Sequence, residues 1–420
     1  MHIGLNVHRL SNLKHYAGLV EHALAQGTSV TLFCDHTDTY TRRDGPKSYE
    51  FADVARIPPF RNGRPCVTTY RSLEDLADQL RRSRVNVFFS LYRLPMLVAL
   101  KREHLPGLAF AEIQHGWDSL IHGADPDVFD VVYAFSAGWA KWWADYGVHE
   151  GRLQPEDYAR ALKQMESVLV PVGFAEMEQL RYIDPEAARA RLGLPQGKRV
   201  VAFLPFPFDS VRTEFWPHWV YGRRRPAQVA AIALARRWEC WPYAARGWND
   251  RRVIAAVREF CDRHDALLVT KSRQKNPVRR YVRALSDRVL YDDAHYPATI
   301  LDLLVAADLC VHFYSSALSE AVYAGTPSIC VSPTSEEWPV YGRRMVVPEF
   351  SDAPESFYNF PGVTWRLRVP EFIERFGRAS LAEFTLDPAR RRLFIEKFLG
   401  FADVNVAARI LADVRRRFVV

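Results

Sequence analysis

The sequence predicts an α/β protein in which parallel sheets are covered by helices on both faces. Short, almost continuous apolar runs alternate with segments of helical spacing along most of the chain, which is typical of strands buried on both faces. The length of 420 residues fits two domains of ordinary size better than one. With 48% hydrophobic and 13% aromatic residues, both domains can build full cores.

The first part of the chain begins with a strand at its second residue and continues as alternating helices and strands. Residues 35–66 are polar and contain proline and glycine, which predicts a long loop with little regular structure. The expected strands span residues 2–7, 28–34, 85–90, 108–113, 131–135 and 167–172, and the expected helices span 11–26, 72–81, 95–101 and 137–146.

The second part of the chain repeats this alternation and ends in helices. Aromatic residues and arginines interleave in a long loop over 205–249, which could stack on a base, bind RNA, line the wall between domains or face a membrane. Residues 333–368 contain five prolines and are predicted to be rich in loops. The expected strands span 199–204, 266–270, 289–292, 309–314 and 328–331, and the expected helices span 252–263, 299–306, 317–323, 370–376, 389–399 and 404–418.

The composition indicates which kind of partner the protein binds and in which cell compartment it lies. A net charge of +7 suits an anionic partner, such as nucleotide phosphates, an anionic lipid surface or nucleic acid. No RNP-type motif accompanies the charge, which disfavours nucleic acid. The six cysteines are scattered without a CxxC pair and are interpreted as reduced core residues of a cytoplasmic protein. We expect no signal peptide, and no apolar run approaches the roughly 18 residues of a membrane-spanning helix.

The stretch over residues 306–331 carries the clearest candidate for a ligand site. A buried strand ends at Ser315 and Ser316 and passes directly into a helix. In parallel sheets ligands bind where strands end and helices begin, and two hydroxyls with the N–H groups of a first helical turn suit a phosphate. Glu320 follows about one turn later, where its carboxylate could reach ribose hydroxyls. The alternative is that Ser315 only caps the helix and Glu320 is a solvated helix residue.

A cluster of cations follows the strand predicted at 266–270. The sequence there reads Lys271-Ser272-Arg273-Gln274-Lys275, with cations at alternate positions. Fixed cations that leave a sheet suit a diphosphate, because they neutralise charge on a departing phosphate. The alternative is a solvated basic turn. Asp292 and Asp293 after the next strand are interpreted as a strand-end loop and not as a metal site.

A histidine leaves the strand predicted at 108–113, in the segment Gln114-His115-Gly116-Trp117-Asp118. This order places the imidazole of His115 at the carboxyl edge of a sheet. Histidine is the usual general base for a hydroxyl nucleophile, with a pKa expected at about 6–7. Asp118 could orient the imidazole or act in its place. The alternative is a capping histidine beside a glycine that permits the turn.

Several of these segments resemble one known group of enzymes. A strand ending in Tyr314-Ser315-Ser316, followed by Glu320-Ala321, Ala324-Gly325-Thr326-Pro327 and another strand, resembles the nucleotide-binding segment of GT-B-type glycosyltransferases. The likeness is greatest to the CDP-glycerol glycerophosphotransferase and surface-carbohydrate branch. Many GT-B enzymes carry two glutamates here, and in this chain His312 takes the place of the first and Glu320 of the second.

Other segments extend the resemblance over most of the chain. His115-Gly116 resembles the His-Gly element of glycerophosphotransferases, and residues 173–180 resemble the linker between their two domains. Relatives often have Lys-Pro-His-Pro at the cationic segment, where this chain has no histidine. The role of a group that assists the leaving phosphate is therefore assigned to Lys271 and Arg273.

The resemblance implies a GT-B-like fold of two Rossmann-like doubly wound domains that face each other across a cleft. Residues 1–173 would form an acceptor domain and residues 174–403 a nucleotide-donor domain. Residues 404–420 would form a C-terminal helix that could pack back on the first domain. Tyr314, Ser315, Ser316 and Glu320 would then belong to the nucleotide site, together with Lys271 and Arg273.

The resemblance also implies an activity. The chain is predicted to move a glycosyl or alditol-phosphate group from a CMP/CDP- or UDP-linked donor to a hydroxyl of a cell-surface polysaccharide, lipid-linked or protein acceptor. His115 would deprotonate that hydroxyl, and the mechanism would need neither a metal ion nor a cofactor. We expect a cytoplasmic protein whose basic groups at 390–392 and 415–417 could also contact anionic lipid on the inner face of the cell membrane.

Two alternative functions remain open at this point. A UDP-sugar 2-epimerase shares the architecture and a C-terminal nucleotide site, but it would convert a nucleotide sugar without any acceptor. A non-catalytic nucleotide- or carbohydrate-binding member would bind tightly and turn nothing over.

Overall fold

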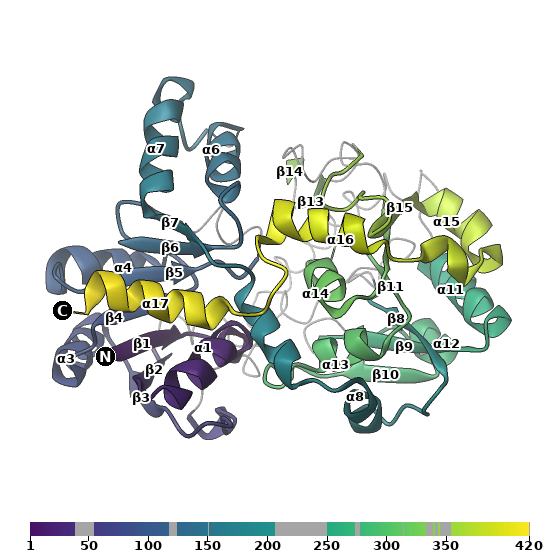
Figure 1. Ribbon diagram of the computed structural model, residues 1–420, viewed down its shortest axis with the longest axis horizontal. Helices are drawn as coiled ribbons and strands as arrows, with labels where there is room; N and C mark the ends of the chain where they lie inside the picture. The colour runs from purple at the N-terminus through teal and green to yellow at the C-terminus, as the bar shows by residue number, and fades with distance from the viewer. Residues whose placement is uncertain are drawn as a thin grey trace, which may run out of the picture.

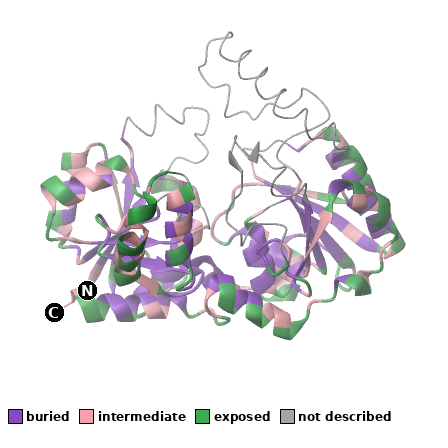
Figure 2. Ribbon diagram, turned by 90° about the horizontal axis from the view of Figure 1, so that it is seen from above, coloured by how far each residue is buried: buried purple, intermediate pink, exposed green. Residues whose placement is uncertain are grey.

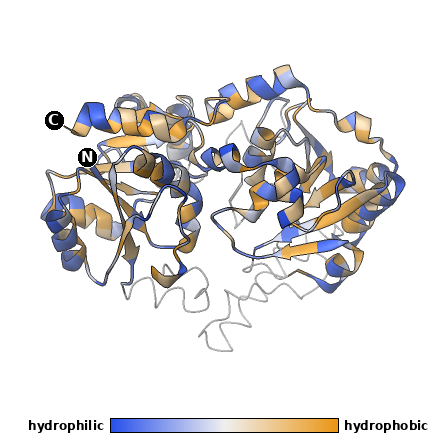
Figure 3. Cartoon of the chain, turned by 60° about the horizontal axis from the view of Figure 1, so that its bottom comes forward, coloured by the Kyte–Doolittle hydropathy of each residue, from blue (hydrophilic) through white to orange (hydrophobic). Residues whose placement is uncertain are grey.

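The computed structural model describes residues 1–37, 54–116, 124–149, 151–205, 250–273, 278–313, 315–332, 339–340, 343–344 and 354–419. Two parallel sheets form the centres of two domains that lie side by side (Figure 1). Buried residues are concentrated in the sheets, and exposed residues lie on the outer faces of the helices (Figure 2). Hydropathy follows the same division (Figure 3). The predicted fold class, two Rossmann-like doubly wound domains, is confirmed.

The first sheet has seven parallel strands in the order β3-β2-β1-β4-β5-β6-β7. The chain order reverses between β1 and β4, and in open α/β sheets a ligand crevice lies at the carboxyl ends of such strands. Strand β1 is buried on both faces from Ile3 to Val7, and its apolar side chains belong to a core cluster shared with α1. The strands are β1 (His2–Val7), β2 (Ser29–Asp35), β3 (Cys66–Tyr70), β4 (Val87–Ser90), β5 (Ala109–Ile113), β6 (Val131–Ala134) and β7 (Leu169–Pro171).

Helices surround this sheet, and α1 follows β1 directly. The apolar residues of α1 recur every three or four positions, at Leu13, Tyr16, Ala17 and Val20, so one face of the helix enters the core. The helices of this part are α1 (Leu13–Ala25), α3 (Leu73–Ser83), α4 (Pro95–Ala99), α6 (Trp139–His149) and α7 (Tyr158–Val168), and a 3₁₀ helix over Ala175–Tyr182 leads to the second sheet.

The second sheet has six parallel strands in the order β10-β9-β8-β11-β12-β15. Here the order reverses between β8 and β11, so a second crevice opens at the carboxyl ends of those strands. The strands are β8 (Arg199–Phe203), β9 (Ala266–Ser272), β10 (Arg288–Tyr291), β11 (Leu309–His312), β12 (Ser328–Ser332) and β15 (Thr364–Arg368). A separate antiparallel pair joins β13 (Pro339–Val340) to β14 (Arg343–Arg344).

The helices of the second part are shorter, and the last of them leaves this domain. Helix α17 lies beside α1 and the first sheet (Figure 1). Its apolar face, which includes Val406, Ile410 and Val414, shares a core cluster with β1 and β2. The helices are α8 (Pro185–Arg191), α11 (Asp250–Arg263), α12 (Arg280–Leu285), α13 (Thr299–Ala306), α14 (Ala317–Ala324), α15 (Val369–Arg375), α16 (Pro388–Phe394) and α17 (Val406–Phe418), with a π-helical turn over Ile395–Leu399 after α16.

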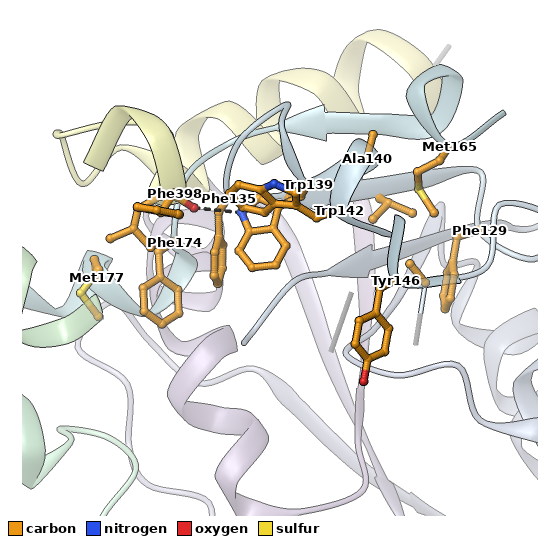
Figure 4. Packing of buried hydrophobic residues seen from close by; sticks show 14 of the residues in the cluster. Phe129, Phe135, Trp139, Ala140, Trp142, Tyr146, Met165, Phe174, Met177 and Phe398 are labelled. Atoms are coloured by element: carbon orange, nitrogen blue, oxygen red, sulfur yellow. Dashed lines mark hydrogen bonds between the residues drawn. The ribbon is translucent and has the colours of Figure 1, made fainter. Parts of the chain in front are cut away.

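The chain is fastened to the first domain just before α17. The indole Nε1 of Trp139 donates a hydrogen bond to the carbonyl oxygen of Phe398 at 2.9 Å (Figure 4). The rings of Phe135, Phe174 and Trp142 pack in the same cluster. Trp139 and Trp142 therefore serve mainly as packing residues. The predicted domain boundaries at 173 and 403 stay a prediction.

Several elements differ from the sequence prediction, among them β9, α7 and β15. Strand β9 extends to Ser272, so Lys271 lies on the strand and not after it. Helix α7 was not predicted, and it includes Ser167 and Val168, which were assigned to a strand. Strand β15 lies in the region that five prolines marked as loop; it forms because Trp365 and Leu367 alternate with polar residues and pack on the core beside β12. The predicted loop over 205–249 lies outside the described residues except for Pro205.

The 3₁₀ helix over Ala175–Tyr182 packs closely against α1. A Cβ added at Gly18 would come within 2.7 Å of Cγ of Glu178, so only glycine allows this approach. Glu178 in turn accepts a hydrogen bond from the backbone N–H of Ala407 at 2.7 Å, in the first turn of α17. A carboxylate in that position stabilises a helix N-terminus. The contact thus ties three segments that are far apart in sequence.

Replacing Gly18 with alanine should lower thermal stability. Overpacking of this kind costs about 1–3 kcal/mol, which exceeds the gain of about 1 kcal/mol that alanine brings to a helix interior. Gly107→Ala is the matched control, because a Cβ there meets no atom within 4 Å. If the Gly18→Ala protein melts at the same temperature as the wild type, α1 and the 3₁₀ helix can move apart without a loss of stability.

Candidate functional site

A cleft of about 630 Å³ lies between the carboxyl edges of the two sheets, and both domains contribute to its walls. Strand ends and helix starts supply most of its polar lining, as the topology of both sheets requires. Asp118 and Tyr314 lie outside the described residues. The six other residues that the sequence predicted all line this cleft: His115, Lys271, Arg273, Ser315, Ser316 and Glu320.

The wall from the second domain is built around the step from β11 to α14. The hydroxyl of Ser315 accepts a hydrogen bond from the backbone N–H of Ala317 at 3.2 Å, so Ser315 does cap the helix while it lines the cleft. The next two N–H groups of α14 donate to the carbonyl oxygens of Ser315 and Ser316. The first turn is therefore not a row of open donors as predicted, because local turn bonds occupy these N–H groups.

Glu320 is not the solvated helix residue of the alternative interpretation. Its side chain is only 3% exposed, and Lys14 Nζ on α1 donates to its Oε1 at 2.7 Å. The other carboxylate oxygen, Oε2, has no hydrogen-bond partner among the described residues. Gly325, with φ of +81°, ends α14 in the left-handed conformation and turns the chain toward β12. A residue that lines the cleft thus has one buried carboxylate oxygen without a hydrogen-bond partner in the described part of the chain.

The cations of β9 are paired and partly buried. Lys271, 8% exposed, donates to the carbonyl oxygen of Asp292 at 2.8 Å, and its Nζ lies 3.4 Å from Asp292 Oδ1. Arg273 Nε donates to Asp293 Oδ1 at 3.0 Å. Burial lowers the pKa of Lys271, and the nearby Asp292 opposes that shift. The alternative of a solvated basic turn is wrong for Lys271, and the two aspartates act as counter-ions.

His115 lies in the wall from the first domain, after β5. Its ring meets Tyr92 edge-on, with centroids 4.4 Å apart, and the ring of His15 at 5.0 Å. Burial lowers the pKa of His115 to about 3, and the cations Arg9 and Lys14 lower it further, although a backbone hydrogen bond to Ile113 acts in the other direction. The expectation of a pKa of about 6–7 is therefore wrong. The sequence places the imidazole at the sheet edge but cannot show how much water it loses.

Lys14 and Glu176 are site residues that the sequence analysis missed. Lys14 contacts Glu320 on α14 and Glu176 on the 3₁₀ helix, so it joins both domains and the segment between them. The partners lie far from Lys14 in sequence, and no local pattern shows the contact. One signal was present, because the polar pair Lys14-His15 interrupts the apolar face of α1 just after the carboxyl end of β1.

His295 is a third missed residue. It lines the cleft from the loop after β10, and burial together with Arg273 lowers its pKa to about 4. The loop is fastened to the first domain, because the Tyr296 hydroxyl donates to Glu21 and its ring stacks on Phe60 with centroids 5.2 Å apart. The loop thereby brings an imidazole beside Lys271 and Arg273 at the end of β9.

The comparisons with known proteins agree with this architecture. The wall teichoic acid polymerase TagF matches with a TM-score of 0.54 and 11% identity, over 99% of this chain and 89% of that chain. The UDP-GlcNAc 2-epimerase from Neisseria meningitidis, bound to UDP-GlcNAc, matches with a TM-score of 0.52 and 11% identity, over 99% and 100%. These are enzymes of one fold. The chain has a GT-B fold.

This result confirms the fold that the resemblance implied, and identities this low show the fold alone. A putative UDP-N-acetylglucosamine 2-epimerase from Listeria monocytogenes also matches, with a TM-score of 0.50 and 11% identity over 100% of this chain and 96% of that one. No protein-family model and no curated protein sequence matches the chain. The GT-B fold thus rests on structure, and the activity has to be argued from the cleft.

Two kinds of feature are absent from the residues that the structure describes. Within these residues, no helix is both long enough and apolar enough to cross a bilayer. The same residues contain no group of three or more histidine, cysteine, aspartate or glutamate side chains placed to hold a metal ion.

The buried histidines predict how stability depends on pH. Burial lowers the pKa of His312 to about 3, so this imidazole stays neutral in the folded state. The unfolded chain takes up a proton below about pH 6.5, and stability therefore falls as the pH drops from about 6.5 toward 4. Each such histidine contributes a loss of about 1.4 kcal/mol per pH unit within that window.

Urea unfolding at several pH values between 7 and 4.5 measures this slope. His8, His115 and His295 add to it in the same direction. His312→Gln, which removes one titrating group, should make the slope shallower. An unchanged slope would mean that His312 is protonated in the folded protein.

Proposed function

We propose that the chain transfers a glycosyl or alditol-phosphate group from a nucleotide-activated donor to a hydroxyl of an acceptor. The observation that carries the proposal is the wall at α14. A buried carboxylate oxygen of Glu320, without a hydrogen-bond partner in the described part of the chain, lines the cleft about one turn after Ser315 and Ser316. The ribose hydroxyls of a nucleotide suit the carboxylate, and its phosphate suits the serine hydroxyls.

The donor's phosphates would lie between the start of α14 and the end of β9. The hydroxyl of Ser316 is exposed in the cleft, and Tyr314 and Ser315 precede it. Lys271 and Arg273 face the same space, each already held by an aspartate. A phosphate would share these cations with Asp292 and Asp293, so their positions are fixed before the ligand binds.

The proposed chemistry uses groups that line the cleft, together with Asp118 as an alternative that lies outside the described residues. His115 takes the proton of the acceptor hydroxyl, with Asp118 as the second candidate, and the oxygen attacks the donor carbon or phosphorus. The bond to the nucleotide phosphate breaks, and Lys271, Arg273 and the serine hydroxyls stabilise the charge on that phosphate. The donor, CMP/CDP- or UDP-linked, is a substrate, and neither a metal ion nor a cofactor takes part.

The acceptor in this proposal is a glycan, a lipid-linked molecule or a protein, and nucleic acid is not a partner. Peripheral contact with anionic lipid at the inner membrane face, for a protein of the cytoplasm, is part of the same proposal. Its support is that Arg392 on α16 and Arg416 on α17 have side chains 76% and 72% exposed.

Ligand binding and product analysis test the function directly. Thermal shifts with CMP, CDP, UDP, GDP and ADP compounds identify the nucleotide, and CDP-glycerol and UDP-GlcNAc are then incubated with and without acceptor alcohols. Group transfer that depends on the acceptor supports the proposal. Conversion of a nucleotide sugar without acceptor would show an epimerase, and tight binding without turnover would show a binding protein.

Replacing Ser315 and Ser316 together with alanine should weaken nucleotide binding by about 1–3 kcal/mol, because the lost hydroxyls contact a charged phosphate. Isothermal titration with the nucleotide found in the thermal-shift screen measures the change. Ser332→Ala, at the end of the neighbouring strand β12, is the control. Wild-type affinity in a folded double variant would remove both serines from the site.

The rate should not depend on imidazole protonation in the neutral range. The pKa of His115 is lowered to about 3, so the neutral form that accepts a proton is present from pH 8 down to about pH 4. Activity of the neutral base would be lost only as the pH falls through about 3. The dependence of kcat/KM on pH between 5 and 8 checks this. An acid limb near pH 6.5 that disappears in His115→Gln would show that the ligand-bound cleft is wetter than the structure implies.

A further inference from the structure

A second imidazole in the cleft is backed by a buried carboxylate. Glu176, on the 3₁₀ helix between the domains, is 1% exposed. Its Oε2 lies 3.5 Å from Nδ1 of His15 on α1, and its Oε1 is in ion-pair contact with Lys14. Neither carboxylate oxygen receives a well-directed hydrogen bond from the described residues. Such a carboxylate is well placed to stabilise a positive charge that appears on the ring.

Burial and neighbouring cations lower the pKa of both His15 and His115, and what distinguishes His15 is the carboxylate beside its Nδ1. The charged groups that lower the pKa of His115 are the cations Arg9 and Lys14. The groups facing His15 include Lys14, Arg273 and two further histidines, His115 and His295, but also the carboxylate of Glu176. A proton taken from an acceptor makes the ring an imidazolium, and a carboxylate on the opposite nitrogen lowers the energy of that state.

The geometry of the pair also fixes which nitrogen reacts. Nδ1 of His15 faces Glu176, so Nε2 is the atom that can accept a proton. His15 lines the same cleft as the phosphate residues, and its ring lies 5.0 Å from that of His115. Contacts of this kind are often long in a ligand-free site and shorten when substrate binds. The separation of 3.5 Å is therefore compatible with a working pair.

We infer that Glu176 and His15 form a carboxylate–imidazole pair that accepts the proton of the acceptor hydroxyl, and that this pair takes the place of His115 as the base of the proposed reaction. The inference rests on the proposed transferase function. The hydroxyl proton moves to Nε2 of His15 while the acceptor oxygen forms its bond to the donor carbon or phosphorus. The donor's bond to the nucleotide phosphate breaks, and the electron pair leaves with that phosphate. The imidazolium, held by Glu176, then returns its proton to the product phosphate or to water.

Folding assembles this pair from two segments that Gly18 allows to approach. Residue 15 lies about one turn before Gly18 on α1, and Glu176 precedes Glu178, whose side chain lies against Gly18. A change in the packing of α1 on the 3₁₀ helix would thus move the carboxylate relative to the ring. Glu176 acts on the reacting proton through His15 and is a positioning residue in this scheme.

The test compares His15→Gln and Glu176→Gln with the wild type, using whichever of CDP-glycerol or UDP-GlcNAc the wild type turns over. His15→Gln should lower kcat by about 10²–10⁴-fold, the contribution of a positioned base, with donor affinity within about threefold of the wild type. Glu176→Gln should lower kcat in the same direction. His22→Gln is the control, because His22 lies on the same helix, is hydrogen-bonded to Gln26 and is not among the residues that line the cleft.

A series of acceptor alcohols separates a catalytic from a structural role. The loss in His15→Gln should shrink as the hydroxyl becomes more acidic, because a more acidic alcohol needs less help from a base. A loss that is equal for all alcohols, or full activity in His15→Gln while His115→Gln is inactive, would overturn the inference. If His15→Gln folds poorly, the Glu176→Gln variant, which keeps its volume, decides: wild-type kcat there overturns the pair.

Donor binding and transfer by the wild type show whether the proposed transferase function or the role of the His15–Glu176 pair is wrong. Failure of the wild type to bind or transfer either donor would overturn the proposed function, and the proton-accepting role of His15 with it. Transfer by the wild type that persists unchanged in both variants would overturn only the role of the pair.

Discussion

The ion pairs of Lys14 join the two walls of the cleft. One ammonium group on α1 contacts Glu176 between the domains and Glu320 on the helix that borders the proposed donor site. Two carboxylates that are almost fully buried share this one cation, and burying either without it would be costly. The ion pair also limits which ligands the cleft can bind. A ligand that hydrogen-bonds to the carboxylate of Glu320 must displace Lys14 or share the carboxylate with it.

The same principle organises the rest of the cleft. Lys271 and Arg273 are held by aspartates from the neighbouring strand end, so the cations stay in place without a phosphate. Burial lowers the pKa of His115 and His295, and nearby cations, Arg9 and Lys14 at His115 and Arg273 at His295, act in the same direction and keep both rings neutral. One cavity therefore contains cations that can bind an anion and neutral imidazole rings that can accept a proton.

The sequence predicted those parts of the molecule that depend on local pattern. The limits of β1 and α13 agree with the apolar runs, and Glu320 was placed correctly one turn after the serines. Residues whose role comes from a distant contact could not be found, because Lys14 and Glu320 are 306 positions apart. The ionisation of His115 was predicted wrongly for a related reason. Its pKa depends on burial, and burial is a property of the whole fold. Strand β15 was missed because nearby prolines outweighed a short alternating pattern.

The return of α17 to the first domain has a consequence for how the protein is made. The apolar side chains of Val406, Ile410 and Val414 complete a core whose other members include residues of β1 and β2. During synthesis, part of the apolar surface of the first domain stays uncovered until almost the whole chain has left the ribosome. A release of the chain before residue 406 would leave that surface open to aggregation. The domain that is translated first is thus the one that is finished last.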